Sequence, residues 1–207
     1  MTDRSAEPDP VVCVEDARGQ PRSYEPIDDA DLHRLLRTAQ ADVDRFFARN
    51  PHLAEWREKM LAVAFVQGGA EHYLRGNRGI WDLDVIVCFD GPRSKHLRRQ
   101  MMFWDWGPSK FGRCPYDPPV YTGRSVDVKF WVFPGAPDPA QALRDWLTAR
   151  LKAKPDPSSK RDLAQEPVIL LWPEERFGEV AWDPNMNPPA KESSTDVRRS
   201  PVGLAPA

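Results

Sequence analysis

The stretch FVQGGAEHYLRGNRGIWDLDVIVCF, residues 65–89, decides how this chain folds. It closes the apolar run at residues 61–66 and contains a second one, LDVIVCF, at residues 83–89. Continuous apolar runs of this length are typical of strands that are buried on both faces. Between the runs stand Gly68-Gly69, and the residues that follow suit a helix beginning right after the glycines. The stretch therefore predicts a buried strand, a glycine turn, a short helix and a second buried strand.

Two acids open the second apolar run. Side chains alternate across a strand, so Asp82 and Asp84 share one face while Leu83 and Val85 share the other. Carboxylates this close repel each other and need help to stay ionised at pH 7. A divalent cation supplies that help, and Mg²⁺ favours oxygen ligands. The pair predicts a metal site, with two solvated acids at a strand end as the alternative.

A third acid, Asp127, stands within SVDVKFWVF at residues 125–133, which the β-branched and aromatic residues predict to be a strand. A carboxylate is unfavourable to bury without a partner. If this strand lies beside the preceding one, Asp127 joins Asp82 and Asp84, and three carboxylates around two metals can clamp a transferring phosphoryl group. Lys129 falls on the same face, where it balances the acids, touches a phosphate or forms a structural ion pair. The alternative is an acid that faces solvent on an edge strand.

Further elements flank these strands. The spacing of apolar residues predicts helices over residues 27–50, 52–60, 93–103 and 140–153 and a fourth strand over residues 168–172. The order of elements is that of one layered domain of helices and strands.

Composition limits the remaining possibilities. The 207 residues are 41% hydrophobic and 29% charged with a formal net charge of −2, which suits one ordinary domain and excludes a basic coat for nucleic acid over the whole surface. No apolar run reaches the roughly 18 residues that cross a bilayer. The three cysteines lie far apart, which favours a reducing, cytoplasmic location and excludes a four-ligand zinc site.

The two ends of the chain differ from the middle. Residues 1–26 are polar and predict a mostly flexible tail, with a short edge strand over residues 11–14 as its candidate element. Residues 183–207 are rich in proline and almost without large apolar residues, so we expect a disordered tail. The folded domain is therefore expected over residues 27–182.

The residues quoted above resemble the DNA polymerase β-like nucleotidyltransferase superfamily, in a small form of the bacterial type. Residues 65–89 hold the main signature and residues 125–130 the third acid, and the resemblance covers roughly residues 52–173. It implies an α+β nucleotidyltransferase-like fold, with a mixed sheet of four to five strands flanked by helices. It also implies an enzyme that transfers a nucleoside monophosphate from a nucleoside triphosphate, by default ATP, to a hydroxyl acceptor.

The resemblance implies a role for each site residue. Gly68 and Gly69 would cradle the phosphates, Asp82 and Asp84 would bind two Mg²⁺ ions, and Asp127 would hold the ion nearest the acceptor hydroxyl or take its proton. Many members carry Ser where this chain has Gly69, which weakens the grip on phosphate. A tight turn is the simpler interpretation of the glycine pair.

Basic and aromatic residues surround these motifs. Arg75 and Arg78 stand between the glycines and the acids, where a triphosphate could be reached. The segment 93–113 is locally basic and could receive a triphosphate or RNA, or form a solvated face. The loop at residues 104–112 has aromatic residues that would stack on a base or pack together.

The acceptor stays open at this stage. A small molecule, a protein and an RNA all fit, and a homodimer or a separately encoded partner would complete the site. The alternative function is a catalytically inactive nucleotidyltransferase-like module that binds a nucleotide or a partner. A metal-dependent phosphodiesterase would explain the acids but not the glycine spacing.

Overall fold

The structure is a computed structural model that describes residues 12–15, 21–24, 27–76, 82–92, 94, 97, 100–103, 125–135, 137–152 and 163–186. Three of the features singled out above lie wholly or mostly outside these residues: Arg78, the loop at residues 104–112 and the basic segment 93–113, of which 94, 97 and 100–103 are described.

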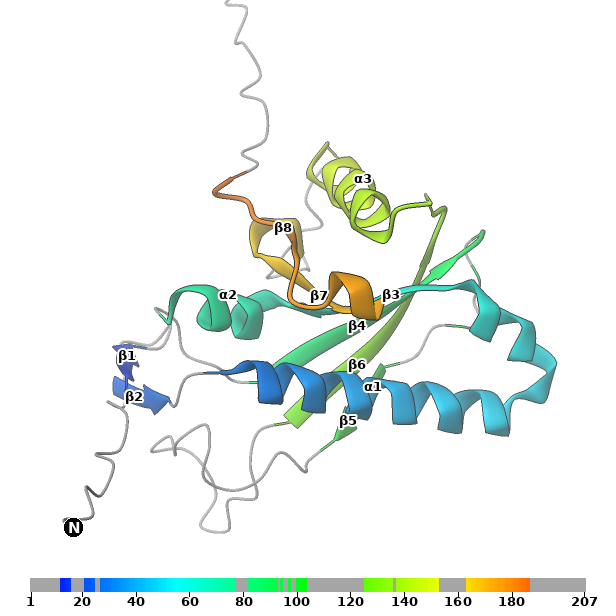
Figure 1. The fold of residues 1–207 in the computed structure, drawn as a ribbon, viewed down its shortest axis with the longest axis horizontal. Coiled ribbons are helices and arrows are strands. Elements are labelled where there is room, and N and C mark those ends of the chain that lie inside the picture. The colour runs from blue at the N-terminus through cyan, green and yellow to red at the C-terminus, as the bar shows by residue number, and fades with distance from the viewer. Residues whose placement is uncertain are drawn as a thin grey trace, which may run out of the picture.

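A mixed sheet forms the centre of the domain (Figure 1). Within the described residues it has six strands in the order β5-β6-β4-β3-β7-β8. The pairing of β4 with β6 is parallel, and every other pairing in this sheet is antiparallel. The strands are β3 (Met60–Val66), β4 (Asp82–Asp90), β5 (Gln100–Phe103), β6 (Ser125–Phe133), β7 (Val168–Trp172) and β8 (Val180–Trp182).

Both faces of the central strands are buried, which explains their continuous apolar sequences. On one face, Phe65 of β3 and Leu83 of β4 pack in a core with α1 (Asp29–Arg49) and α2 (Gln67–Arg75). On the other face, Ile86 and Cys88 of β4 pack in a second core with α3 (Pro139–Lys152). Figure 1 shows α1 and α3 on opposite sides of the sheet.

The ends of α1 follow the sequence closely. The carboxylate of Asp28 accepts a hydrogen bond from the backbone N–H of Asp31, and the carboxylate of Asp31 accepts one from the N–H of Asp28. This reciprocal cap satisfies donors that the first turn leaves free. Asn50 ends the helix, and η1 (Pro51–Lys59), a 3-10 helix, leads into β3.

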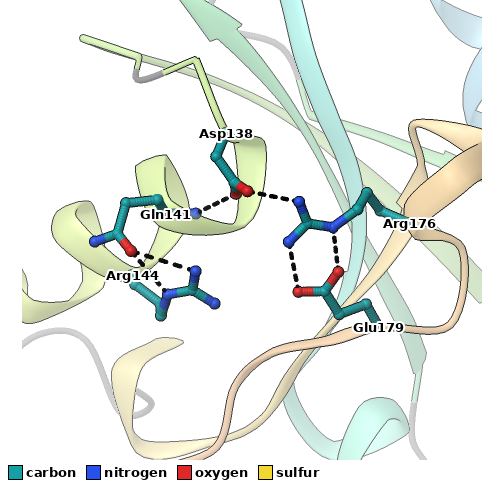
Figure 2. A network of polar contacts seen from close by, with 5 residues as sticks. All are labelled: Asp138, Gln141, Arg144, Arg176 and Glu179. Atoms are coloured by element: carbon teal, nitrogen blue, oxygen red, sulfur yellow. Dashed lines mark hydrogen bonds and ion pairs between the residues drawn. The ribbon is translucent and has the colours of Figure 1, made fainter.

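A polar network holds the start of α3 to the turn between β7 and β8, which contains the short 3-10 helix η3 (Glu174–Arg176). Asp138 accepts a hydrogen bond from the backbone N–H of Gln141, as a helix cap does, at 2.9 Å. Arg176 donates to Asp138 at 2.6 Å and to Glu179 at 2.7 Å (Figure 2). Arg144 donates to the side chain of Gln141. We call these five residues the Arg176 network.

The α+β class and the mixed sheet flanked by helices are confirmed. The four apolar runs form β3, β4, β6 and β7 within a residue or two of the expected bounds. The sheet is larger than the predicted four to five strands because the short edge strands β5 and β8 add to those four. The helix predicted over residues 93–103 is wrong for its last four residues, which form β5, since a short apolar run such as QMMF suits either element.

Two short strands lie in the N-terminal region that was predicted to be mostly flexible. β1 (Val12–Glu15) pairs with β2 (Pro21–Tyr24) in an antiparallel two-stranded sheet. The strand expected near residues 11–14 is therefore present, but it pairs within its own region instead of extending the six-stranded sheet. A third short 3-10 helix, η2 (Leu163–Gln165), precedes β7.

Candidate metal centre

The parallel pairing of β4 and β6 brings three aspartates together. Asp84 is the register partner of Asp127, and Asp82 stands two residues earlier on β4, opposite Ser125. Each aspartate offers one carboxylate oxygen, and these oxygens all lie within 4.8 Å of one another. The expectation that Asp127 joins the other two acids is therefore confirmed in its geometry. We call Asp82, Asp84 and Asp127 the aspartate cluster.

The cluster lies on the α3 side of the sheet but beyond the apolar core there. Asp84 is followed at alternate positions of β4 by Ile86 and Cys88, which belong to that core. Asp84 and Asp127 are each only 4% exposed, while Asp82 at the strand end is partly exposed. The cluster thus consists of two buried carboxylates, those of Asp84 and Asp127, and one partly exposed carboxylate, that of Asp82.

Burial and repulsion make Asp84 a weak acid for its type. Burial raises its pKa most, and the charge of Asp82 raises it further. Lys129 opposes both effects, and the resulting pKa is about 6 instead of the usual 3.8. A bound cation would restore the ionised form, because an opposite charge within a few ångström stabilises a carboxylate.

Lys129 provides the cationic contact to the cluster. Its ammonium lies 2.5 Å from Oδ1 of Asp84 and 3.9 Å from Oδ2 of Asp127. The prediction that Lys129 shares a face with Asp127 is confirmed, and of its proposed roles the structure shows the ion pair.

The glycine pair follows β3, the strand that pairs with β4 beside Asp84, but it does not form the turn that was expected before the helix. Val66 is the register partner of Asp84, and α2 begins at the next residue, Gln67, so that both glycines lie in its first turn instead of before it. A Cβ on Gly69 would meet the ring of Phe65 at 2.4 Å, so packing alone explains the missing side chain there. A phosphate-binding role for Gly68 and Gly69 stays a prediction.

Gln67 was not singled out by the sequence, yet it has an unusual backbone. Its φ is +62°, a conformation that residues other than glycine adopt rarely, and Gln lacks the local hydrogen bonding that favours Asn and Asp there. Val66 stands at the N-cap of the helix that follows, and its side chain makes no capping hydrogen bond. The strained junction therefore lies directly beside the strand position of Asp84, and nothing in the residue type could have predicted it.

Arg75 is used elsewhere in the fold. Its guanidinium contacts the carboxylates of Glu71 and Asp183, each at 2.5 Å, and the side chain of Asp183 is only 7% exposed. The described partners of Arg75 are thus two acids outside the aspartate cluster. Asp183, which was placed at the start of the C-terminal tail, is a buried ion-pair partner that follows β8 directly.

The donor set fits Mg²⁺. All three groups offer carboxylate oxygens, the ligands that Mg²⁺ prefers, and two oxygens on opposite sides of one Mg²⁺ lie about 4 Å apart. The oxygens of the three aspartates lie within 4.8 Å of one another, which is of the same order as that span, so the cluster could hold a metal ion.

Comparison with protein-family models, with curated proteins and with solved structures gives no match for this chain. Within the described residues, no helix combines the length and apolar character needed to span a membrane. The functional argument therefore rests on the residues of the chain itself.

Proposed function

We propose that this chain is a Mg²⁺-dependent nucleotidyltransferase, which transfers a nucleoside monophosphate from a nucleoside triphosphate to a hydroxyl acceptor. The observation that carries the proposal is the convergence of Asp82, Asp84 and Asp127 from two neighbouring parallel strands. The β4–β6 pairing, the burial of two of the acids and the helix start beside them support the proposal.

Each acid has a role in this proposal. Asp82 and Asp84 hold divalent cations from one strand. Asp127, on the neighbouring strand, holds the cation nearest the acceptor or takes the proton of its hydroxyl. Bound cations would neutralise the phosphates and lower the pKa of the attacking hydroxyl. The burial of Asp84 and Asp127 keeps water away and strengthens these charges.

The start of α2 is the proposed place for the phosphates. Backbone N–H groups at a helix N-terminus favour anions, and this helix has no side-chain cap hydrogen bond from Val66. Gly68 and Gly69 lie in its first turn, one and two residues after Gln67. Lys129 would contact the phosphates of a bound nucleotide through its ammonium group. We take ATP as the default nucleotide donor.

The acceptor is not specified by the described residues. A small molecule, an RNA end and a protein hydroxyl each remain compatible, and a homodimer or a partner protein would extend the site for a large acceptor. A metal- and nucleotide-dependent activity of this kind also suits the cytoplasmic location expected from the cysteines.

The test follows label from the α-phosphate of a nucleoside triphosphate in the presence of Mg²⁺. The protein is incubated with each of the four nucleotides and with small hydroxylated molecules, RNA and protein fractions as acceptors. We expect transfer of label with release of pyrophosphate, and we expect its loss in Asp127→Asn. The matched control is Asp138→Asn in the Arg176 network, which should retain transfer.

Other outcomes would replace the proposal. Tight, Mg²⁺-dependent nucleotide binding without transfer to any class of acceptor would favour the inactive binding module. Cleavage of a phosphodiester without use of a triphosphate would favour a phosphodiesterase that uses the same three carboxylates.

A further inference from the structure

The ammonium of Lys129 lies where a metal ion would bind. It contacts Oδ1 of Asp84 at 2.5 Å and stands 3.9 Å from Oδ2 of Asp127, so it lies between the two buried carboxylates. The side chains of these aspartates are each 6% exposed, whereas that of Lys129 is 25% exposed. Lys129 is the register partner of Ile86, so its charge approaches Asp84 from the side away from Asp82.

From this geometry we infer that Lys129 is an internal counter-cation that competes with divalent metal for the aspartate cluster. The inference rests on the proposed metal centre. In the metal-free protein the ammonium offsets the repulsion among the three carboxylates. A metal ion that binds Asp84 must displace it, because two cations so close to one carboxylate oxygen repel each other strongly.

The same arrangement links metal binding to nucleotide binding. The four-carbon stem of lysine is flexible, so the displaced ammonium can swing away from Asp84 without moving β6. An incoming triphosphate offers it a new anionic partner beside the metal ions. Metal should therefore bind weakly to the free protein and more tightly once a nucleotide is present, because only then does Lys129 regain a partner.

The experiment measures Mn²⁺ binding to the nucleotide-free protein by electron paramagnetic resonance, a readout that does not depend on turnover. Lys129→Met removes the charge and keeps most of the side-chain volume, and Lys129→Arg keeps the charge. The control is Lys59→Met, because Lys59 also pairs with an acid, Glu55 at 3.9 Å, but lies on the chain just before β3, at the end of that strand away from Val66 and Asp84.

We expect Lys129→Met to bind Mn²⁺ about tenfold or more tightly than the wild type, since the ammonium that competes for the carboxylate of Asp84 is removed. Lys129→Arg and Lys59→Met should stay within about threefold of the wild type. A non-hydrolysable triphosphate analogue should then tighten Mn²⁺ binding less in Lys129→Met than in the wild type.

A second measurement follows thermal unfolding with and without metal. In chelator, Lys129→Met should melt below the wild type because Asp84 loses the ammonium that contacts it. Mg²⁺ should raise the melting temperature of this variant more than that of the wild type. A variant that folds only when Mg²⁺ is added would support the inference equally.

Several results would overturn the inference. Lys129→Met could bind Mn²⁺ no more tightly than the wild type, or it could fail to fold even with Mg²⁺ while Lys129→Arg folds. In the first case Lys129 does not compete with metal, and in the second it is a structural ion pair. If neither the wild type nor Lys129→Met binds Mn²⁺, with or without the triphosphate analogue, the proposed metal centre fails as a whole, so the two failures are distinguishable.

Discussion

The aspartate cluster and the Arg176 network both combine carboxylates with a basic side chain, but the pKa values of their acids shift in opposite directions. In the network, hydrogen bonds from Arg176 lower the pKa of Asp138 and of Glu179, which lie near the surface. In the cluster, burial and Asp82 raise the pKa of Asp84 to about 6 although Lys129 touches it. Arg176 thus lowers the pKa of two acids near the surface, whereas Lys129 does not offset the burial of Asp84.

The difference separates a structural role from a candidate functional one. The Arg176 network joins α3 to the turn before β8 and satisfies its carboxylates with arginine (Figure 2). The aspartate cluster joins β4 to β6, and there Lys129 does not offset the effect of burial and of Asp82 on the pKa of Asp84. Perturbed acids of this kind gather at sites where a ligand supplies the missing charge.

The largest expected contrast is in metal affinity. Asp127→Asn removes one of three ligands and should weaken Mn²⁺ binding on the order of 100-fold. Asp138→Asn changes the same residue type in the Arg176 network and should leave the affinity unaltered. Calorimetric titration of both variants measures the contrast. Equal affinities in the two variants would place the metal, if any, outside the aspartate cluster.

The second contrast is in the dependence of stability on pH. Because folding raises the pKa of Asp84, its protonated form stabilises the fold below pH 4, and this contribution is lost as the pH rises through about 6. The shift predicts that the free energy of unfolding of the metal-free protein falls by about 2–3 kcal/mol between pH 4 and pH 7 because of this group. Urea unfolding in chelator measures it.

The Arg176 network should show the reverse dependence. The lowered pKa values of Asp138 and Glu179 mean that their contribution is present at neutral pH and is lost as the pH falls. Asp84→Asn should remove most of the loss of stability above pH 4, with the acid-side loss unchanged. An unchanged slope in that variant would assign the titration to another group.

A third contrast separates packing at the helix start from the charges of the cluster. In Gly69→Ala the new methyl group meets the buried ring of Phe65 and should destabilise the protein by about 2 kcal/mol. Gly76→Ala has no such clash, because no atom lies within 4 Å, and should lose only about 1 kcal/mol from its left-handed backbone. Thermal unfolding compares the two variants.

Metal affinity completes the test of Gly69. If the residue serves packing, Gly69→Ala should bind Mn²⁺ as the wild type does and lose nucleotide affinity only in proportion to its loss of folded protein. A selective loss of nucleotide binding in folded protein would instead support contact between this turn and the phosphates.

The smallest contrast compares two arginines that each contact two acids. Arg75→Met leaves Asp183 buried without its guanidinium and should reduce the free energy of unfolding by about 1–2 kcal/mol. Arg176→Met opens a more exposed network and should cause a smaller loss. Urea unfolding of both variants at pH 7 ranks them, and a larger loss for Arg176 would show that burial is not what distinguishes the two.

The sequence predicted the parts of the fold that depend on local patterns. Alternation placed Asp82 and Asp84 on one face, and the same period placed Lys129 with Asp127. The helix expected over residues 27–50 also followed from the spacing of its apolar residues, and α1 spans Asp29–Arg49. These features depend on neighbours a few positions away, so a single sequence contains the information.

The remaining features depend on distant partners. Arg75 meets Asp183 across 108 positions, and nothing near either residue indicates the pairing. The strands β5 and β8 are short and gain their stability from the edges to which they pair. The clash that a side chain at position 69 would make with Phe65 also cannot be read from the sequence. The glycine motif alone does not tell whether packing or a bound ligand requires Gly69.

The parallel register of β4 and β6 gives the cluster one more property. Two of its aspartates come from one strand and the third arrives only when residues 125–133 have docked beside residues 82–90. An ion held by all three carboxylates would link these two distant segments, so it could bind only when β4 and β6 are paired. Binding would in turn stabilise that pairing against separation of the strands.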